Sequence, residues 1–187
     1  DACTGQKDTQ RVAEIRQESQ RSRTHSDRKV GDQMRILAID PSSNKIESST
    51  TGIVLLDNAK LVDYWVVPYG GENFKTWFKK IGRSLEFDIV VVEKFEVRDN
   101  DYSRDNSVVE TIAAIELCYP DLVLQRNAGY QTDIPNDLLK ALGLWTFDKS
   151  HHNDVRAAAR LGLFYAQRND IEEVIVDIGN RITQMAS

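Results

Sequence analysis

An unbroken run of β-branched residues limits the fold of this chain more than any other feature. The segment from Asp88 to Glu93 reads Asp-Ile-Val-Val-Val-Glu. A strand that is apolar at every central position, and not only at every second one, is typical of a strand covered on both faces. Such strands occur in sheets that carry helices on either side, so the run predicts an α/β fold.

The other apolar segments predict the remaining elements of this fold. Strand-like segments cover residues 36–40, 53–56, 61–67 and 121–124, and helical periodicity covers 73–87, 107–119, 135–142, 150–168 and 170–185. Three strands in succession predict an antiparallel meander, and the later alternation of strands with helices predicts parallel crossovers. We therefore expect a mixed five-stranded sheet with helices on both faces.

Residues 1–34 differ in composition from the rest of the chain. They hold 13 charged residues and seven apolar ones, and their net charge is +1. This segment lacks the broad apolar stripe of a helix that packs on a core. We expect a polar extension over residues 1–34, disordered or ordered only against a partner such as another protein, and one folded domain over 35–187.

Composition excludes several classes of protein. The chain has 187 residues and only two cysteines, which excludes a disulfide framework and a cysteine-based zinc site. It has neither the run of about 20 apolar residues that spans a bilayer nor the apolar segment of a signal peptide, so we expect a cytoplasmic protein without membrane contact. The net charge of −5 argues weakly against nucleic-acid binding, although a carboxylate active site can make a nuclease acidic.

Acidic residues follow two of the predicted strands. Asp40 ends the first strand and Glu93 ends the Val-rich strand. Ligand sites in open α/β sheets lie beyond the carboxyl ends of strands, and buried carboxylates are costly unless cations accompany them. His151 and Asp154 stand three residues apart at the start of the helix over 150–168, so they share a face. Turn capping or the helix dipole explains each carboxylate alone, but not the whole set.

The set of Asp40, Glu93, Asp154 and His151 indicates a particular kind of metal site. Oxygen ligands with one imidazole suit Mg²⁺ or Mn²⁺ better than zinc. Carboxylates that hold two such ions about 4 Å apart catalyse phosphodiester hydrolysis. We therefore expect a nuclease with two divalent ions.

These motifs resemble the RuvC-like branch of the RNase H superfamily, over about residues 35–168. The matching segments are ILAIDPSS, TGIVLLD, DIVVVEKF, IPNDLLKALGLW and HHNDVRAAARLGL. The chain is most similar to the Holliday junction resolvases, particularly those of bacteriophages. The resemblance implies an RNase H-like fold, metal ligation and catalysis by Asp40, Glu93, His151 and Asp154, and a homodimer that cuts two strands. The chain departs from the family in Val155, where Ala is usual, and in a longer connection after Asp40.

Basic and aromatic residues near Glu93 are candidates for DNA contact. In the chain after Glu93 these are Lys94, Arg98 and Arg104, and on the helix over 73–87 they are Lys75, Lys79, Lys80 and Arg83. Tyr102 is suited to stacking on a base of an opened junction, which contributes about 1–3 kcal/mol. The apolar face of the helix over 107–119 either packs on the sheet or forms the dimer.

Three functions remain open from the sequence. The first is a Mg²⁺-dependent endonuclease that resolves four-way DNA junctions. The second is a related nuclease that acts on flaps, forks or RNA–DNA hybrids. The third is a DNA-binding or virion assembly protein that has the fold without the activity. Fold alone does not select the reaction. The intact acidic set favours an enzyme over a protein that has only the fold.

Overall fold

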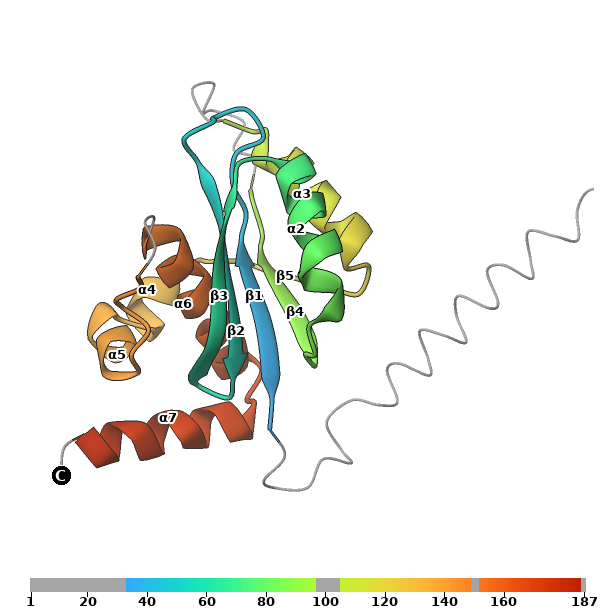
Figure 1. Cartoon of the computed structure of the whole chain (residues 1–187). Coiled ribbons are helices and arrows are strands. Elements are labelled where there is room, and N and C mark those ends of the chain that lie inside the picture. The colour runs from blue at the N-terminus through green and yellow to red at the C-terminus, as the bar shows by residue number, and fades with distance from the viewer. Residues whose placement is uncertain (1–32, 97–104, 149–151, 186–187) are drawn as a thin grey trace, which may run out of the picture. The chain divides into compact units, whose positions relative to one another are not determined.

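The computed structural model describes residues 33–96, 105–148 and 152–185 (Figure 1). Its strands are β1 (Arg35–Asp40), β2 (Thr50–Asp57), β3 (Lys60–Pro68), β4 (Ile89–Glu93) and β5 (Val123–Gln125). Its helices are α2 (Gly71–Lys80), η1 (Gly82–Ser84), α3 (Val108–Cys118), α4 (Tyr130–Asp133), α5 (Asn136–Ala141), α6 (His152–Arg168) and α7 (Glu172–Met185).

The five strands form one mixed sheet in the order β3-β2-β1-β4-β5. The pairs β1–β2 and β2–β3 are antiparallel, whereas β1–β4 and β4–β5 are parallel. This is the meander followed by crossovers that the order of elements predicts. The expected α/β fold with a mixed five-stranded sheet is confirmed.

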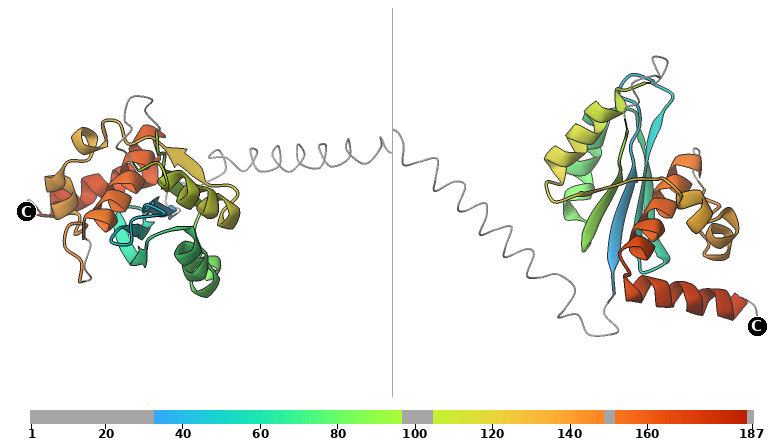
Figure 2. Two further views of the ribbon diagram at one scale, coloured as in Figure 1. Left: turned by 90° about the horizontal axis from the view of Figure 1, so that it is seen from above. Right: turned by 180° about the vertical axis from the view of Figure 1, so that it is seen from behind.

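Helices cover both faces of the sheet. Helices α2 and α3 lie against one face, and α6 with α4 and α5 lies against the other (Figures 1 and 2). Alternate residues of β1 enter the two cores, since Ile36 and Ala38 pack on the α6 side and Leu37 and Ile39 on the α2–α3 side. A strand buried on both faces accounts for the continuous apolar runs in the sequence.

The folded part includes Met34, which stands at the end of the predicted extension. Met34 is buried, and its backbone N–H donates to Asn58 Oδ1 at 2.9 Å. Of the predicted extension, residues 1–32 lie outside the described residues. None of the helices in the described part of the chain is long and apolar enough to cross a membrane.

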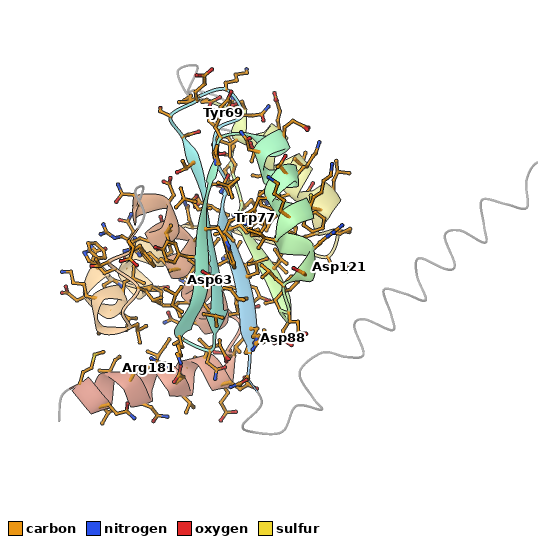
Figure 3. The ribbon with its side chains drawn as sticks, viewed as in Figure 1. Asp63, Tyr69, Trp77, Asp88, Asp121 and Arg181 are labelled. Carbon is orange, nitrogen blue, oxygen red and sulfur yellow. The ribbon has the colours of Figure 1, made fainter. Side chains whose placement is uncertain are left out.

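Helix α2 is shorter than the sequence predicts. The expected helix over 73–87 is wrong beyond Lys80, because the chain turns into the short 3₁₀ helix η1. Trp77 lies between α2 and the sheet (Figure 3), and a Cβ at Gly82 would lie 2.7 Å from the Trp77 ring and 2.6 Å from Tyr119 Oη. This close approach requires glycine, which is itself a poor helix former. Helix α4, with four residues, is too short to show periodicity and was not predicted.

Gly179 offers a test of helix α7. It is exposed within the helix, and a Cβ there would meet no atom within 4 Å. Because alanine loses less backbone entropy than glycine in a helix, Gly179→Ala should raise the free energy of unfolding by about 0.5–1 kcal/mol. Urea denaturation measures this change. A decrease would mean that Gly179 is not in a helix in solution.

Candidate functional site

Two of the predicted site residues meet at the carboxyl edge of the sheet. Strands β1 and β4 are parallel, and Ile39 pairs with Val92. The next residues along the two strands are Asp40 and Glu93, so their side chains emerge side by side. A hydrogen bond joins the two carboxyl groups.

Asp154 reaches the same edge from helix α6. Gly52 of β2 pairs directly with Asp40, and a Cβ at Gly52 would lie 2.3 Å from the backbone C and O of Asp154. The first turn of α6 therefore lies directly on β2, beside the end of β1. The Thr50 hydroxyl, at the start of β2, donates a hydrogen bond to Asp154 Oδ2.

The carboxylates of Asp40, Glu93 and Asp154 repel one another at a site that is partly shielded from water. Burial raises the pKa of Asp40 well above its usual range, and the charges of Glu93 and Asp154 raise it further. Among the described residues, no lysine or arginine forms an ion pair with Asp40 or Asp154. Such a cluster is costly unless a cation compensates it.

The donor set fits Mg²⁺ or Mn²⁺ in chemical type. Carboxylate oxygens are the ligands these ions prefer, and a divalent ion would relieve the repulsion at Asp40. In the described ranges no three His, Cys, Asp or Glu side chains converge to hold one ion. The fourth predicted ligand, His151, lies outside the described residues. The fit therefore rests on ligand type and mutual proximity.

The connection from β5 to α4 brings residues to the site that the sequence analysis missed. The Lys94 backbone N–H donates to the Gln125 carbonyl at 2.9 Å. Two residues further, Asn127 Nδ2 donates to Glu93 Oε1 at 2.5 Å. Asn127 follows a third parallel strand, so strand order was the one signal that could have placed it at this edge.

Tyr130 also faces the acidic cluster. Burial raises the pKa of its hydroxyl, and so do the charges of Glu93 and Asp40. The Arg160 guanidinium lies 5.4 Å from the centre of the Tyr130 ring. Arg160 is itself buried and donates through Nε to the Ile134 carbonyl at 2.9 Å, so it fixes α4 against α6.

The long connection after Asp40 is held by buried hydroxyl groups. The Ser42 hydroxyl accepts from the Gly70 N–H at 3.0 Å and from the Thr51 hydroxyl at 2.9 Å. The Ser43 hydroxyl donates to Asp105 and lies 3.1 Å from the Ser107 hydroxyl, just before α3. These bonds fix the chain on the far side of Asp40, so its longer connection does not loosen the site.

The predicted DNA-contact residues are only partly described. Arg98, Tyr102 and Arg104 lie outside the described residues. Lys94 follows Glu93 and is half-buried. Lys75 and Lys79 lie on α2, which covers the face opposite to α6, so the structure does not bring them to the carboxylates. Lys75 also forms an ion pair with Glu72 at 2.7 Å.

The fold is similar to that of solved structures. No family model and no curated protein matches the chain. The structure of Thermus thermophilus RuvC in complex with a Holliday junction substrate matches with a TM-score of 0.55 and 15% identity, covering 75% of this chain and 97% of that one. Thermus thermophilus RuvC alone matches with a TM-score of 0.51 and 15% identity, covering 73% and 97%. At this identity the likeness establishes a RuvC-like fold.

Proposed function

We propose that the chain is a Mg²⁺- or Mn²⁺-dependent endonuclease that resolves four-way DNA junctions. The observation that carries this proposal is the meeting of Asp40, Glu93 and Asp154 at one edge of a RuvC-like sheet. Three neighbouring carboxylates, with no ion-pair partner for Asp40 in the described part of the chain, cost folding free energy and are suited to bind a metal. The solved relative with junction DNA supports this class of substrate.

Each residue of the site has a distinct role in this proposal. Asp40, Glu93, His151 and Asp154 would hold two divalent ions, which would supply an activated water and stabilise charge on the leaving 3′ oxygen. Asp40 on β1 lies between β4, which carries Glu93, and the start of α6, which carries Asp154, so it would act as a ligand together with each of them. Tyr130 and the Gln125–Asn127 connection border the site on the β5 side and limit the approach of the phosphate.

The DNA backbone is held next to the carboxylates. We assign this contact to Lys94, Arg98 and Arg104, with Lys75 and Lys79 as more distant contacts and Tyr102 as the residue that stacks on an opened base. Residues 35–187 form the nuclease domain, which buries Met34, and the extension that precedes Met34 contacts another protein. By its motifs the enzyme is of the bacteriophage type and acts in the cytoplasm.

A homodimer follows from the reaction, because resolution needs two cuts in opposing strands. We assign the dimer contact to the outer face of α3. Val109 is 45% exposed and Leu117 75% exposed on this face, and an apolar groove runs beside them. Its lining residues are Ala113, Glu116, Leu117, Pro120, Leu122 and Leu124. A second copy of the same face would cover these side chains.

Leu117→Glu tests this contact. The new charge should weaken self-association at least about tenfold, because it would be desolvated at the interface. Sedimentation measures the association, and junction cleavage should change from paired cuts to single nicks. Met185→Glu, at an exposed position of α7, serves as the control. A Leu117→Glu protein that dimerises like the unmutated one would remove α3 from the interface.

A panel of substrates tests the choice of reaction. Labelled four-way junctions, flaps, forks, RNA–DNA hybrids and linear duplexes are incubated with the full chain and Mg²⁺. We expect cleavage of the four-way junction in preference to all others. Preferred cleavage of flaps, forks or hybrids would indicate the related nuclease, and binding without any cleavage would indicate a non-catalytic DNA-binding or assembly protein.

A further inference from the structure

The connection from β1 to β2, residues 41–49, carries an exposed isoleucine at the carboxyl edge of β1. Strand β1 ends at Asp40, and Thr50, which begins β2, pairs with Pro68 at the end of β3. The connection therefore lies at the edge to which Asp40 belongs, at the upper end of the sheet in Figure 1. Within this connection Ile46 is 49% exposed.

The backbone of Ile46 is fixed by a turn. Its N–H donates to the Ser43 hydroxyl at 2.9 Å. Its carbonyl accepts from the Ser49 N–H at 3.0 Å and from the Ser49 hydroxyl at 2.8 Å. Both backbone polar groups of Ile46 are engaged, so its exposed side chain stands on a fixed backbone.

The turn itself is anchored to the starts of α2 and α3. The Gly70 N–H donates to the buried Ser42 hydroxyl at 3.0 Å, and the Gly71 N–H donates to Asn44 Oδ1 at 2.9 Å. The Asn44 N–H donates to the Ser107 hydroxyl, just before α3, at 2.9 Å. A side chain that is held in place before it binds a partner loses less conformational entropy on binding.

The exposed part of the turn offers a partner apolar surface and no net charge. Lys45 and Glu47, on either side of Ile46, are both exposed and carry opposite charges, and Ser48 is neutral. A contact with phosphate groups needs an excess of positive charge, which this turn lacks. The side chain of Ile46 is therefore the feature of the turn that a ligand can recognise.

We propose that Ile46 is an apolar wedge that enters the base stack where the strands of a four-way junction cross; the inference rests on the proposed function. Isoleucine is among the apolar side chains that DNA-binding proteins insert between base steps. Unstacking costs free energy within a continuous duplex, and it costs less where the stack is already interrupted, as at a crossover. A wedge beside Asp40 would thus place the crossover next to the carboxylates.

Val62 shows what an ordinary exposed apolar residue looks like in this fold. Single exposed apolar side chains are common on protein surfaces, and Val62 is 48% exposed. It lies near the start of β3, beside the end of β2 and so at the edge opposite to Asp40. Ile46 has almost the same exposure, but it lies at the edge of the carboxylates on an anchored turn. Val62 is therefore the matched control for Ile46.

A four-way junction with a fluorescent adenine analogue beside the crossover tests the proposal, because such an analogue brightens when it is unstacked. The full chain is added in chelator, and a linear duplex with the same analogue is the reference. We expect the unmutated chain to brighten the junction. Ile46→Ala should lose most of this signal and bind the junction about tenfold more weakly, whereas its binding to the duplex is unchanged. Ile46→Leu and Val62→Ala should behave like the unmutated chain.

Three results would overturn the wedge and leave the nuclease proposal standing. They are an unmutated chain that binds the junction without brightening it, an Ile46→Ala protein that brightens and binds it normally, and an equal loss of affinity for junction and duplex. The last would indicate a general DNA contact. If the unmutated chain neither binds nor cuts the junction, the proposed function itself fails, and the wedge with it.

Discussion

Asp40→Asn should abolish strand cleavage, by about a thousandfold or more, and preserve binding to a four-way junction. Asp40 lies between Glu93 and Asp154 and shares a hydrogen bond with Glu93. Removing its charge would remove a ligand of the proposed divalent ions. Metal ions contribute several kcal/mol of transition-state stabilisation, and each 1.4 kcal/mol is worth about tenfold in rate. The amide is isosteric, and the proposed function assigns junction binding to basic residues elsewhere. Loss of binding by a folded Asp40→Asn protein would contradict this division of roles.

The same substitution should stabilise the metal-free protein at neutral pH. The pKa of Asp40 is raised in the folded chain, so the folded state holds its proton more tightly than the unfolded state, whose pKa is about 3.9. Stability is therefore lost as the pH rises from about 3.9 through the raised pKa. Asp40→Asn lacks this titrating group, so its thermal midpoint in chelator should fall less over that range. A steeper fall than in the unmutated protein would contradict the raised pKa.

Gly52→Ala should damage both the fold and the activity. Its Cβ would lie 2.3 Å from the Asp154 backbone C and O and 2.7 Å from the Val155 N. Backbone atoms cannot rotate away as a flexible side chain does, so the start of α6 must move off β2. We expect a loss of about 1–3 kcal/mol in the free energy of unfolding, as for other overpacked cores. Because Asp154 moves with the helix, cleavage should fall far more than the folded fraction does.

Gly162→Ala is the control for Gly52→Ala. Gly162 also lies where α6 meets the sheet, but its nearest contacts are side-chain atoms of Ala38 and Leu56 at 3.1 Å. Side chains can shift by a few tenths of an ångström, so this variant should lose stability without a comparable loss of activity per folded molecule. Equal activity per folded molecule in the two variants would show that Gly52 does not position Asp154.

The sequence predicted the architecture because the apolar pattern is local information. The continuous run at 88–93 and the order of strands and helices were sufficient to predict the mixed sheet. The end of α2 was missed because the close contact of Gly82 with Tyr119, which follows α3, is long-range. Periodicity along one segment contains no signal of a neighbour that approaches from another.

The site was predictable in part for the same reason. Asp40 and Glu93 each end an apolar strand, so their position at the carboxyl edge of the sheet could be predicted from the strand pattern. Thr50 and Asn127 meet their carboxylates 104 and 34 residues away in the chain, and only the register of the sheet and the position of α6 bring them there. Gly52 likewise lies at the site only because it pairs with Asp40 in the sheet. No local pattern marks these residues.

The most direct test of the central claim is to map the cuts on a fixed four-way junction, end-labelled on each strand in turn, in Mg²⁺. We predict paired nicks at symmetric positions of two opposing strands, with 3′-hydroxyl and 5′-phosphate ends, by the unmutated chain and none by Asp40→Asn. Cleavage that persists in Asp40→Asn, or no cleavage by folded unmutated protein, would contradict the claim that these carboxylates form a metal-dependent phosphodiesterase site.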